Sequence, residues 1–213
     1  MGEDFKTAGK QGITGEVIRR IASLYGEMDR AYAEFAGEYQ LDCAGCRDNC
    51  CTQRFYHYTL AEYIFLLEGL KKIPFAKRDL IIKRARVVVG SYAHEAQAGE
   101  IFKLMCPANF EGLCALYFWR PMICRLHGVP NFFTMPGGET KESGGCAVLA
   151  EKHKQPGRLL DRTPFYSALA AIEKDLRQGL GFRQKLRRTT AQMILDMALE
   201  LDVEGEFSPE GGI

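Results

Sequence analysis

The chain has 213 residues, of which 46% are apolar and 26% are charged, a composition typical of a globular protein with one substantial core or two small ones. Its formal net charge of +1 gives no reason to expect nucleic acid or an acidic membrane surface as a partner. The N-terminal residues lack the apolar stretch of a signal peptide, and no apolar run is long enough to cross a bilayer. We therefore expect a cytoplasmic protein with no membrane association.

The first half of the chain predicts three helices. After a flexible N-terminus at 1–12, apolar residues recur at helical spacing over residues 13–35, with Thr14 as a candidate cap. Thr59 and Glu62 form the capping-box pattern that starts a second helix.

A third helix is predicted to open at Pro74 and to end its regular part at Gly99. Residues 105–147 are dense in Pro, Gly and Cys, which predicts irregular structure, with an exposed loop over 135–145.

Two further helices are predicted near the C-terminus. One starts at Thr163–Pro164 and ends at about Gln178, before a "GLG" stop, and the other covers about 184–201. No repeat and no strong strand alternation are visible. We expect a mainly α protein in which residues 13–202 form a single metal-binding domain, with a flexible tail at 203–213. Its helices would surround an irregular cysteine-rich core built from loops.

The cysteines carry the clearest chemical signal. The first four are Cys43, Cys46, Cys50 and Cys51, and the second four are Cys106, Cys114, Cys124 and Cys146. In a reducing cytosol clustered thiols more often ligate metal than form disulfides. A two-residue gap lets two sulfurs converge on one metal, whereas neighbouring side chains such as Cys50 and Cys51 diverge. Those two would serve different centres, or one would ligate while the other packs. We predict that all eight converge and that most ligate metal.

Other cysteine chemistries fit the spacing less well. A thioredoxin-like redox pair lacks the surrounding βαβ pattern, and a radical-SAM site has its gaps in the opposite order. His57 and His153 have no partner at zinc-finger spacing. Four thiolates around Zn²⁺ or a [4Fe–4S] core leave a charge near −2, which calls for cations and N–H donors nearby. Arg120 and Arg125 are the candidates.

His127, three residues after Cys124, could touch a metal centre or hydrogen-bond near it.

The C-x2-C-x3-CC pattern, with the later run "CPANFEGLCALYFWRPMICRLHG", resembles the YkgJ-type cysteine-cluster family, described as a zinc- or iron-chelating domain with eight characteristic cysteines. The positions matching its signature are Cys106, Pro107, Cys114, Leu116, Tyr117, Arg120, Pro121, Cys124 and Arg125. Cys146 stands where the eighth cysteine is expected, so the resemblance covers residues 43–146. The chain departs from the family where Phe118 and Trp119 replace a common polar pair.

Three functions remain open from the sequence. The first is an iron–sulfur protein, with a [4Fe–4S] cluster, in electron transfer, redox sensing or cluster-dependent chemistry. The second is a structural zinc module that binds a partner protein. The third, implied by a link of the family to flagellin lysine methylases, is a protein-modifying enzyme. No catalytic residue or phosphate-binding loop is recognisable, so enzyme status stays undecided. Because residues 100–150 carry little regular structure, the metal is predicted to be part of the fold.

Overall fold

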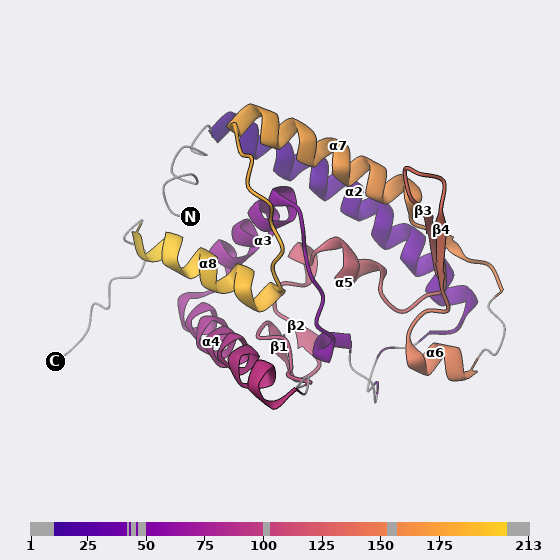
Figure 1. Ribbon diagram of the computed structural model, residues 1–213, viewed down its shortest axis with the longest axis horizontal. Coiled ribbons are helices and arrows are strands. Elements are labelled where there is room, and N and C mark those ends of the chain that lie inside the picture. The colour runs from indigo at the N-terminus through magenta and orange to yellow at the C-terminus, as the bar shows by residue number, and fades with distance from the viewer. Residues whose placement is uncertain are drawn as a thin grey trace.

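The computed structural model describes residues 11–41, 43, 46, 50–99, 103–152 and 157–203, and the part that it describes is mainly helical (Figure 1). The long helices are α2 (Gln11–Glu38), α3 (Leu60–Lys72), α4 (Phe75–Ala98), α7 (Thr163–Leu180) and α8 (Thr190–Val203). Helices α2 and α7 pack side by side, as do α4 and α8. Helix α3 contacts α2, α7 and α8, so it joins the two pairs.

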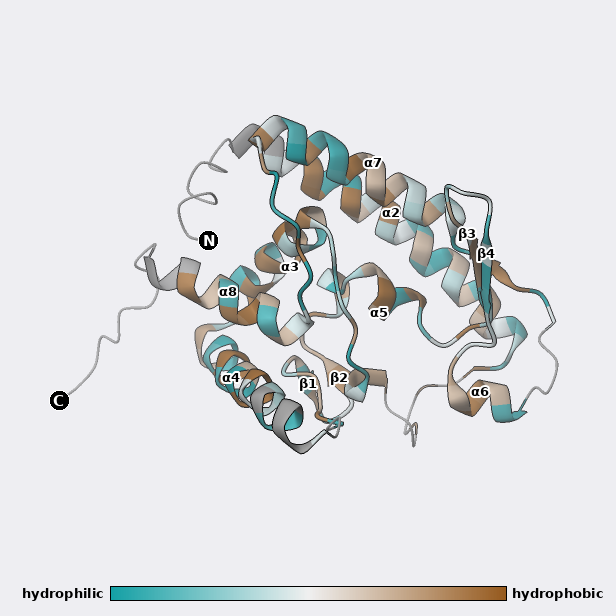
Figure 2. Cartoon of the chain, in the orientation of Figure 1, coloured by the Kyte–Doolittle hydropathy of each residue, from teal (hydrophilic) through white to brown (hydrophobic). Residues whose placement is uncertain are grey.

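Hydrophobic burial explains why α3 takes this place. Nine of its residues are buried, among them Leu60, Leu66 and Leu70, which are almost fully enclosed. Helices α2, α7 and α8 are amphipathic, and Figure 2 shows hydrophobic and hydrophilic residues alternating along them. No helix among the described residues has both the length and the apolar character that a bilayer span requires.

Short elements fill the space beside the long helices. They are η1 (Cys50–Thr52), β1 (Asn109–Phe110), β2 (Leu113–Cys114), η2 (Tyr117–Trp119), α5 (Met122–Leu126), β3 (Asn131–Thr134), β4 (Thr140–Ser143), α6 (Ala147–Lys152) and β5 (Leu160–Asp161). Strands β1 and β2 form an antiparallel pair, and a second sheet has the order β4-β3-β5. In that sheet β3 pairs with β4 antiparallel and with β5 parallel.

Most of the predicted helices are confirmed. Thr59 Oγ1 accepts the Glu62 amide at 3.2 Å, as expected of a cap, and α4 follows Pro74 directly. Helix α4 and helix α7 both end at glycines in the left-handed conformation, Gly99 and Gly181. The sequence predicted these helix ends because few residues other than glycine adopt that conformation without strain.

Several boundaries differ from the prediction. Helix α2 begins at Gln11, so Thr14 lies inside it, and the predicted flexible segments otherwise fall outside the described residues at 1–10 and 204–213. The predicted loop at 135–145 contains strand β4 and the turn of a hairpin. Helix α8 starts at Thr190 instead of residue 184.

The late start of α8 has a local cause. Thr189 and Gln192 exchange two hydrogen bonds, one from the Gln192 amide to Thr189 Oγ1 at 3.2 Å and one from the Thr189 amide to Gln192 Oε1 at 2.9 Å. This is a capping box, and it fixes the first turn of the helix. Just before it, Arg188 pairs with His57 through two backbone hydrogen bonds of 2.7 and 3.0 Å. The segment preceding α8 is therefore extended.

Two buried carboxylates hold the helices together. Glu173 of α7 accepts the amides of Leu60 and Ala61 at 2.9 Å each, which caps the N-terminus of α3 from a distant part of the chain. Glu62 of α3 accepts the Met122 amide at 2.9 Å at the start of α5. Burial raises the pKa of Glu62. Both contacts place α3 in register with its neighbours.

Replacing Glu173 with Ala should lower the free energy of unfolding by about 2 kcal/mol or more, because two buried amides lose their acceptor. Urea denaturation monitored by circular dichroism measures the change. Asp175→Ala on the same helix is the control, since it removes only a largely exposed ion pair with Arg20. It should cost less than about 0.5 kcal/mol. Equal effects of the two substitutions would contradict the capping role.

Candidate metal centre

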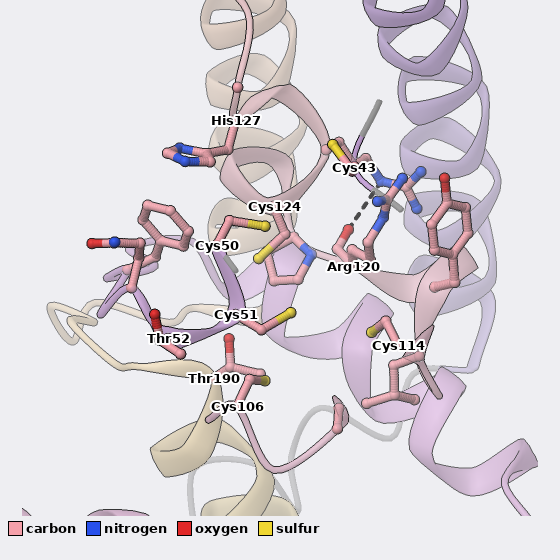
Figure 3. A pocket seen from close by; sticks show the side chains of 18 of the residues that line it. Cys43, Cys50, Cys51, Thr52, Cys106, Cys114, Arg120, Cys124, His127 and Thr190 are labelled. Atoms are coloured by element: carbon pink, nitrogen blue, oxygen red, sulfur yellow. Dashed lines mark hydrogen bonds between the residues drawn. The ribbon is translucent and has the colours of Figure 1, made fainter. Parts of the chain in front are cut away.

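All eight cysteines line one cavity of about 670 Å³ in the middle of the molecule. Its walls come from α2, α3, α4, the start of α8 and both cysteine segments. Figure 3 shows thiols of both segments facing this space. The two segments therefore meet at one site, as the sequence predicted. Ligation of a metal by these thiols remains a prediction.

The first cysteine segment is positioned by short turns. The Cys46 amide donates to the Cys43 carbonyl at 3.3 Å, and Cys50 begins the single turn η1. The Cys106 amide donates to the Cys51 carbonyl at 2.8 Å. This backbone hydrogen bond joins the two cysteine segments, which are far apart in sequence.

A small hairpin arranges two cysteines of the second segment. Strand β2 returns beside β1 with Asn109 opposite Cys114, and the Asn109 amide donates to the Cys106 carbonyl at 2.9 Å. The turn uses positive φ angles at Glu111 and Gly112. The hairpin thus brings Cys106 and Cys114 to one side of the cavity, and the short helix α5 adds Cys124.

Two glycines allow Cys146 to reach the cavity. Its amide donates to the Gly128 carbonyl at 2.9 Å. Gly145 has φ +91°, and a Cβ atom there would lie 2.3 Å from that same carbonyl oxygen. Gly128 has φ +118°, and a Cβ atom there would lie 2.9 Å from the Tyr32 hydroxyl. Neither position accepts a side chain without displacement of its neighbours.

One group of thiols lies deep in the cavity. Burial raises the pKa of Cys124, and Cys106, Cys114 and Cys51 lie close enough to raise it further. Burial likewise raises the pKa of Cys106 to about 12, with added contributions from Cys114 and Cys51. These four cysteines are therefore mutual neighbours, and we refer to them as the inner group.

Three of the remaining four thiols gather near Tyr32 of α2. Burial raises the pKa of the Tyr32 hydroxyl, and Cys43, Cys50 and Cys146 raise it further. The pKa of Cys50 is also raised, first by its neighbour Cys51. We refer to Cys43, Cys46, Cys50 and Cys146 as the outer group. Cys50 and Cys51 are adjacent in the chain but belong to different groups. Cys50 lies where the two groups meet.

Arg120 lies against the inner group. Its guanidinium carbon is 3.7 Å from the centre of the Tyr117 ring, and its Nη2 lies 3.6 Å from Asp29 Oδ1. Its Nε is buried and has no hydrogen-bond partner among the described residues. The positive charge lowers the pKa of Cys51, Cys114 and Cys124 relative to what burial alone would give. A hydrogen bond from Arg120 to metal-bound sulfur remains a prediction.

Asn109 is a donor that the sequence did not reveal. Its Oδ1 accepts the Gly112 amide at 3.0 Å, while its buried Nδ2 has no partner within hydrogen-bond distance in the described part of the chain. The amide lies on the Cys51 side of the hairpin. The pKa of Cys51 is lowered, first by its hydrogen bond with the Cys50 side chain, and the nearby Asn109 amide and Arg120 guanidinium lower it further.

Arg125 lines the cavity, and its charge lowers the pKa of Cys114 relative to what burial alone would give. Arg125 is 3% exposed and donates from Nε to the Arg120 carbonyl at 3.0 Å, from Nη1 to Asp29 Oδ2 at 2.6 Å and from Nη2 to the Phe118 carbonyl. These bonds close the turn between η2 and α5. Arg125 therefore stabilises the segment that presents Arg120 and Cys124, and these three hydrogen bonds all go to oxygen acceptors.

The histidines take different places. His127 caps the C-terminus of α5 and lines the cavity, with its ring centre 5.1 Å from that of Phe55 (Figure 3). A metal contact by His127 remains a prediction. His57 is buried outside the lining, with Nε2 3.1 Å from Thr190 Oγ1, and burial lowers its pKa to about 4. His153 lies outside the described residues.

The thiols surround a space and do not meet at a point. Among the residues that the structure describes, no three Cys, His, Asp or Glu side chains form a group ready to hold an ion. The cavity is nevertheless far larger than a single ion needs, since one water takes about 30 Å³ of the liquid.

No protein-family model, curated protein or solved structure matches this chain. The resemblance to the YkgJ-type family therefore depends on the cysteine motif alone, and membership stays a prediction.

Gly145→Ala should displace Cys146 from the cavity, because the new methyl group would overlap the Gly128 carbonyl at a positive φ. We expect a loss of about 1–3 kcal/mol in the free energy of unfolding and a fall in the metal bound per chain, measured by denaturation and metal analysis. Gly144→Ala is the matched control, since nothing lies within 4 Å of the Cβ that it would add. A neutral Gly145→Ala variant would contradict this geometry.

Proposed function

We propose that this protein binds iron–sulfur clusters in its eight-cysteine cavity and works in electron transfer, redox sensing or cluster-dependent chemistry. The observation that carries the proposal is the arrangement of all eight cysteines of the chain around a single cavity. Cysteine thiolates are the usual ligands of [4Fe–4S] clusters, and eight of them match two such clusters.

The surroundings of the thiols support an anionic occupant. Arg120 Nε and Asn109 Nδ2 are buried donors without partners among the described residues, and a buried N–H without an acceptor costs about 1–3 kcal/mol. Thiolate or sulfide sulfur would satisfy them. Several buried thiols have pKa values raised by burial, so their deprotonation requires a compensating cation. Metal ions supply that charge.

The two cysteine groups suggest two centres. We assign the inner group to one centre and the outer group to the other, because the inner four are mutual neighbours and three of the outer four surround Tyr32. The adjacent Cys50 and Cys51 side chains hydrogen-bond to each other and do not diverge as the sequence predicted, so the two centres would lie next to each other here. Each centre would draw ligands from both cysteine segments, so that each would cross-link the fold.

A bound cluster would supply one-electron chemistry, and the protein's own residues would set its surroundings. Arg120 would donate to sulfur beside the inner group, while Arg125 keeps the Arg120 segment in place. Tyr32 and Phe55 line the cavity and would restrict water near the thiols. Hydrogen bonding and restricted access of this kind tune cluster potentials.

Zinc is the alternative occupant, because it accepts the same thiolates as a structural ion. A module of that kind would bind a partner protein and carry out no redox chemistry. The third reading, a protein-modifying enzyme related to flagellin lysine methylases, gains no specific observation from the described residues. Metal identity separates the first two readings.

Anaerobic purification followed by iron, sulfide and zinc analysis tests the proposal. We expect a brown protein with both iron and acid-labile sulfide. A colourless protein that holds zinc in stoichiometric amounts would contradict the iron–sulfur proposal and favour the zinc module.

The division into two centres is tested by paired substitutions. Cys114→Ser from the inner group and Cys146→Ser from the outer group should each remove one set of Mössbauer signals and leave the other set intact. Circular dichroism checks that both variants remain folded. If either substitution alone removed every iron signal from a folded protein, the two-centre assignment would fail.

Arg120→Gln should lower the reduction potential of one centre by tens of millivolts while iron content is kept. A charge-assisted hydrogen bond contributes about 1.5–3 kcal/mol, and 1.4 kcal/mol corresponds to about 60 mV for a one-electron couple. Redox titration followed by electron paramagnetic resonance measures the shift. Arg158→Gln is the control, because Arg158 pairs with Glu34 and Glu38 on the exposed surface. An unchanged reduction potential in Arg120→Gln would show that Arg120 does not stabilise the reduced state of either centre.

A further inference from the structure

A groove of about 760 Å³ adjoins the cysteine cavity. Helix α4 and the β1–β2 hairpin form its walls, and the lining includes Val87, Val88, Leu104, Met105 and Phe110. Cys106 lines both the groove and the cavity, as do Val88, Leu104 and Gly112. A molecule bound in the groove would therefore lie directly beside one thiol of the inner group.

Apolar side chains are unusually exposed around this groove. Val87 is 70% exposed and Met105 42%, and at the hairpin Leu113 is 76% exposed. Single exposed apolar residues are common on protein surfaces, but a contiguous apolar group beside a cavity is typical of an interaction site. The position of these residues next to Cys106 separates them from isolated exposed side chains such as Leu199 on α8.

The apolar surface has a basic border. Arg84 lines the groove, and Glu111 is the acidic residue among its described lining residues. Lys77 Nζ lies 4.6 Å and the Arg84 guanidinium carbon 4.2 Å from the centre of the groove-lining Phe110 ring. Two cations, Lys77 and Arg84, therefore lie beside one carboxylate at the groove. Charge complementarity therefore calls for a partner with acidic residues around an apolar centre.

We propose that an acidic electron-carrier protein docks on this groove and exchanges electrons with the inner centre past Cys106. The inference rests on the proposed iron–sulfur function. In the transfer, one electron leaves the reduced carrier, which becomes oxidised, and enters the oxidised inner centre, which becomes reduced; no covalent bond changes. The apolar residues would give close contact, and the basic border would steer the approach of the carrier.

The probe is a reduced acidic [2Fe–2S] ferredoxin, mixed anaerobically with the oxidised, cluster-loaded protein in a stopped-flow instrument. Val87→Ser tests the apolar surface and Lys77→Glu tests the basic border. The second-order rate constant should fall about tenfold in each variant and should also fall as ionic strength rises. Dithionite needs no docking surface, so the rate at which it reduces each variant should stay within twofold of the wild-type rate.

Leu199→Ser and Lys185→Glu are matched controls, because both residues are exposed and lie outside the groove lining. Their rates should equal those of the unchanged protein. Ferredoxin rates that do not change in Val87→Ser and Lys77→Glu would overturn the docking proposal. It would also be overturned if ultracentrifugation showed a dimer that Val87→Ser dissociates, since a second copy would then cover the groove. Failure of the iron–sulfur function itself would be seen earlier, because dithionite would then not reduce the wild-type protein.

Discussion

The Cys106 amide donates to the Cys51 carbonyl at 2.8 Å, and at this bond the two cysteine-bearing parts of the chain meet. Most of the short elements around it serve to bring thiols to the same cavity: the β1–β2 hairpin, the turn η1, the helix α5 and the glycine contact at Gly128. The long helices form a frame around that cavity. A protein of this size ordinarily fills its centre with side chains. Here the centre is a space of about 670 Å³ lined by eight thiols.

Such a centre imposes a constraint on stability. A buried donor without an acceptor costs free energy. The proposed anionic group at the thiols would supply acceptors to Arg120 and Asn109. Different residues then hold different parts of this frame in place. Glu173 and Glu62 fix α3 against α7 and α5, and Arg125 fixes the turn that carries Arg120. The proposed metal would hold the remaining cysteine-bearing segments in place.

The sequence predicted the long helices well, because their signals are local. The Thr59 cap and the stops at Gly99 and Gly181 depend on residues within one or two turns. The dense cysteine motif also drew attention to Arg120, whose charge lowers the pKa of Cys51, Cys114 and Cys124, although its role at a metal centre stays a prediction. The start of α8 was misplaced although its capping box, Thr189 and Gln192, was legible in the chain. Contacts between distant segments could not be predicted: Glu173 on the α3 amides, Tyr32 beside the outer thiols, and the ion pair of Arg125 with Asp29.

The central claim is that sulfur atoms of this cavity bind iron as clusters. X-ray absorption spectroscopy of the anaerobically prepared protein at the iron and zinc edges tests it most directly, because it reports the metal, its ligand atoms and any neighbouring metal. The account predicts iron with a shell of sulfur and a second iron at short distance, in a spectrum to which zinc adds little. A spectrum with zinc bound to sulfur and no neighbouring metal, or no bound metal at all, would contradict it.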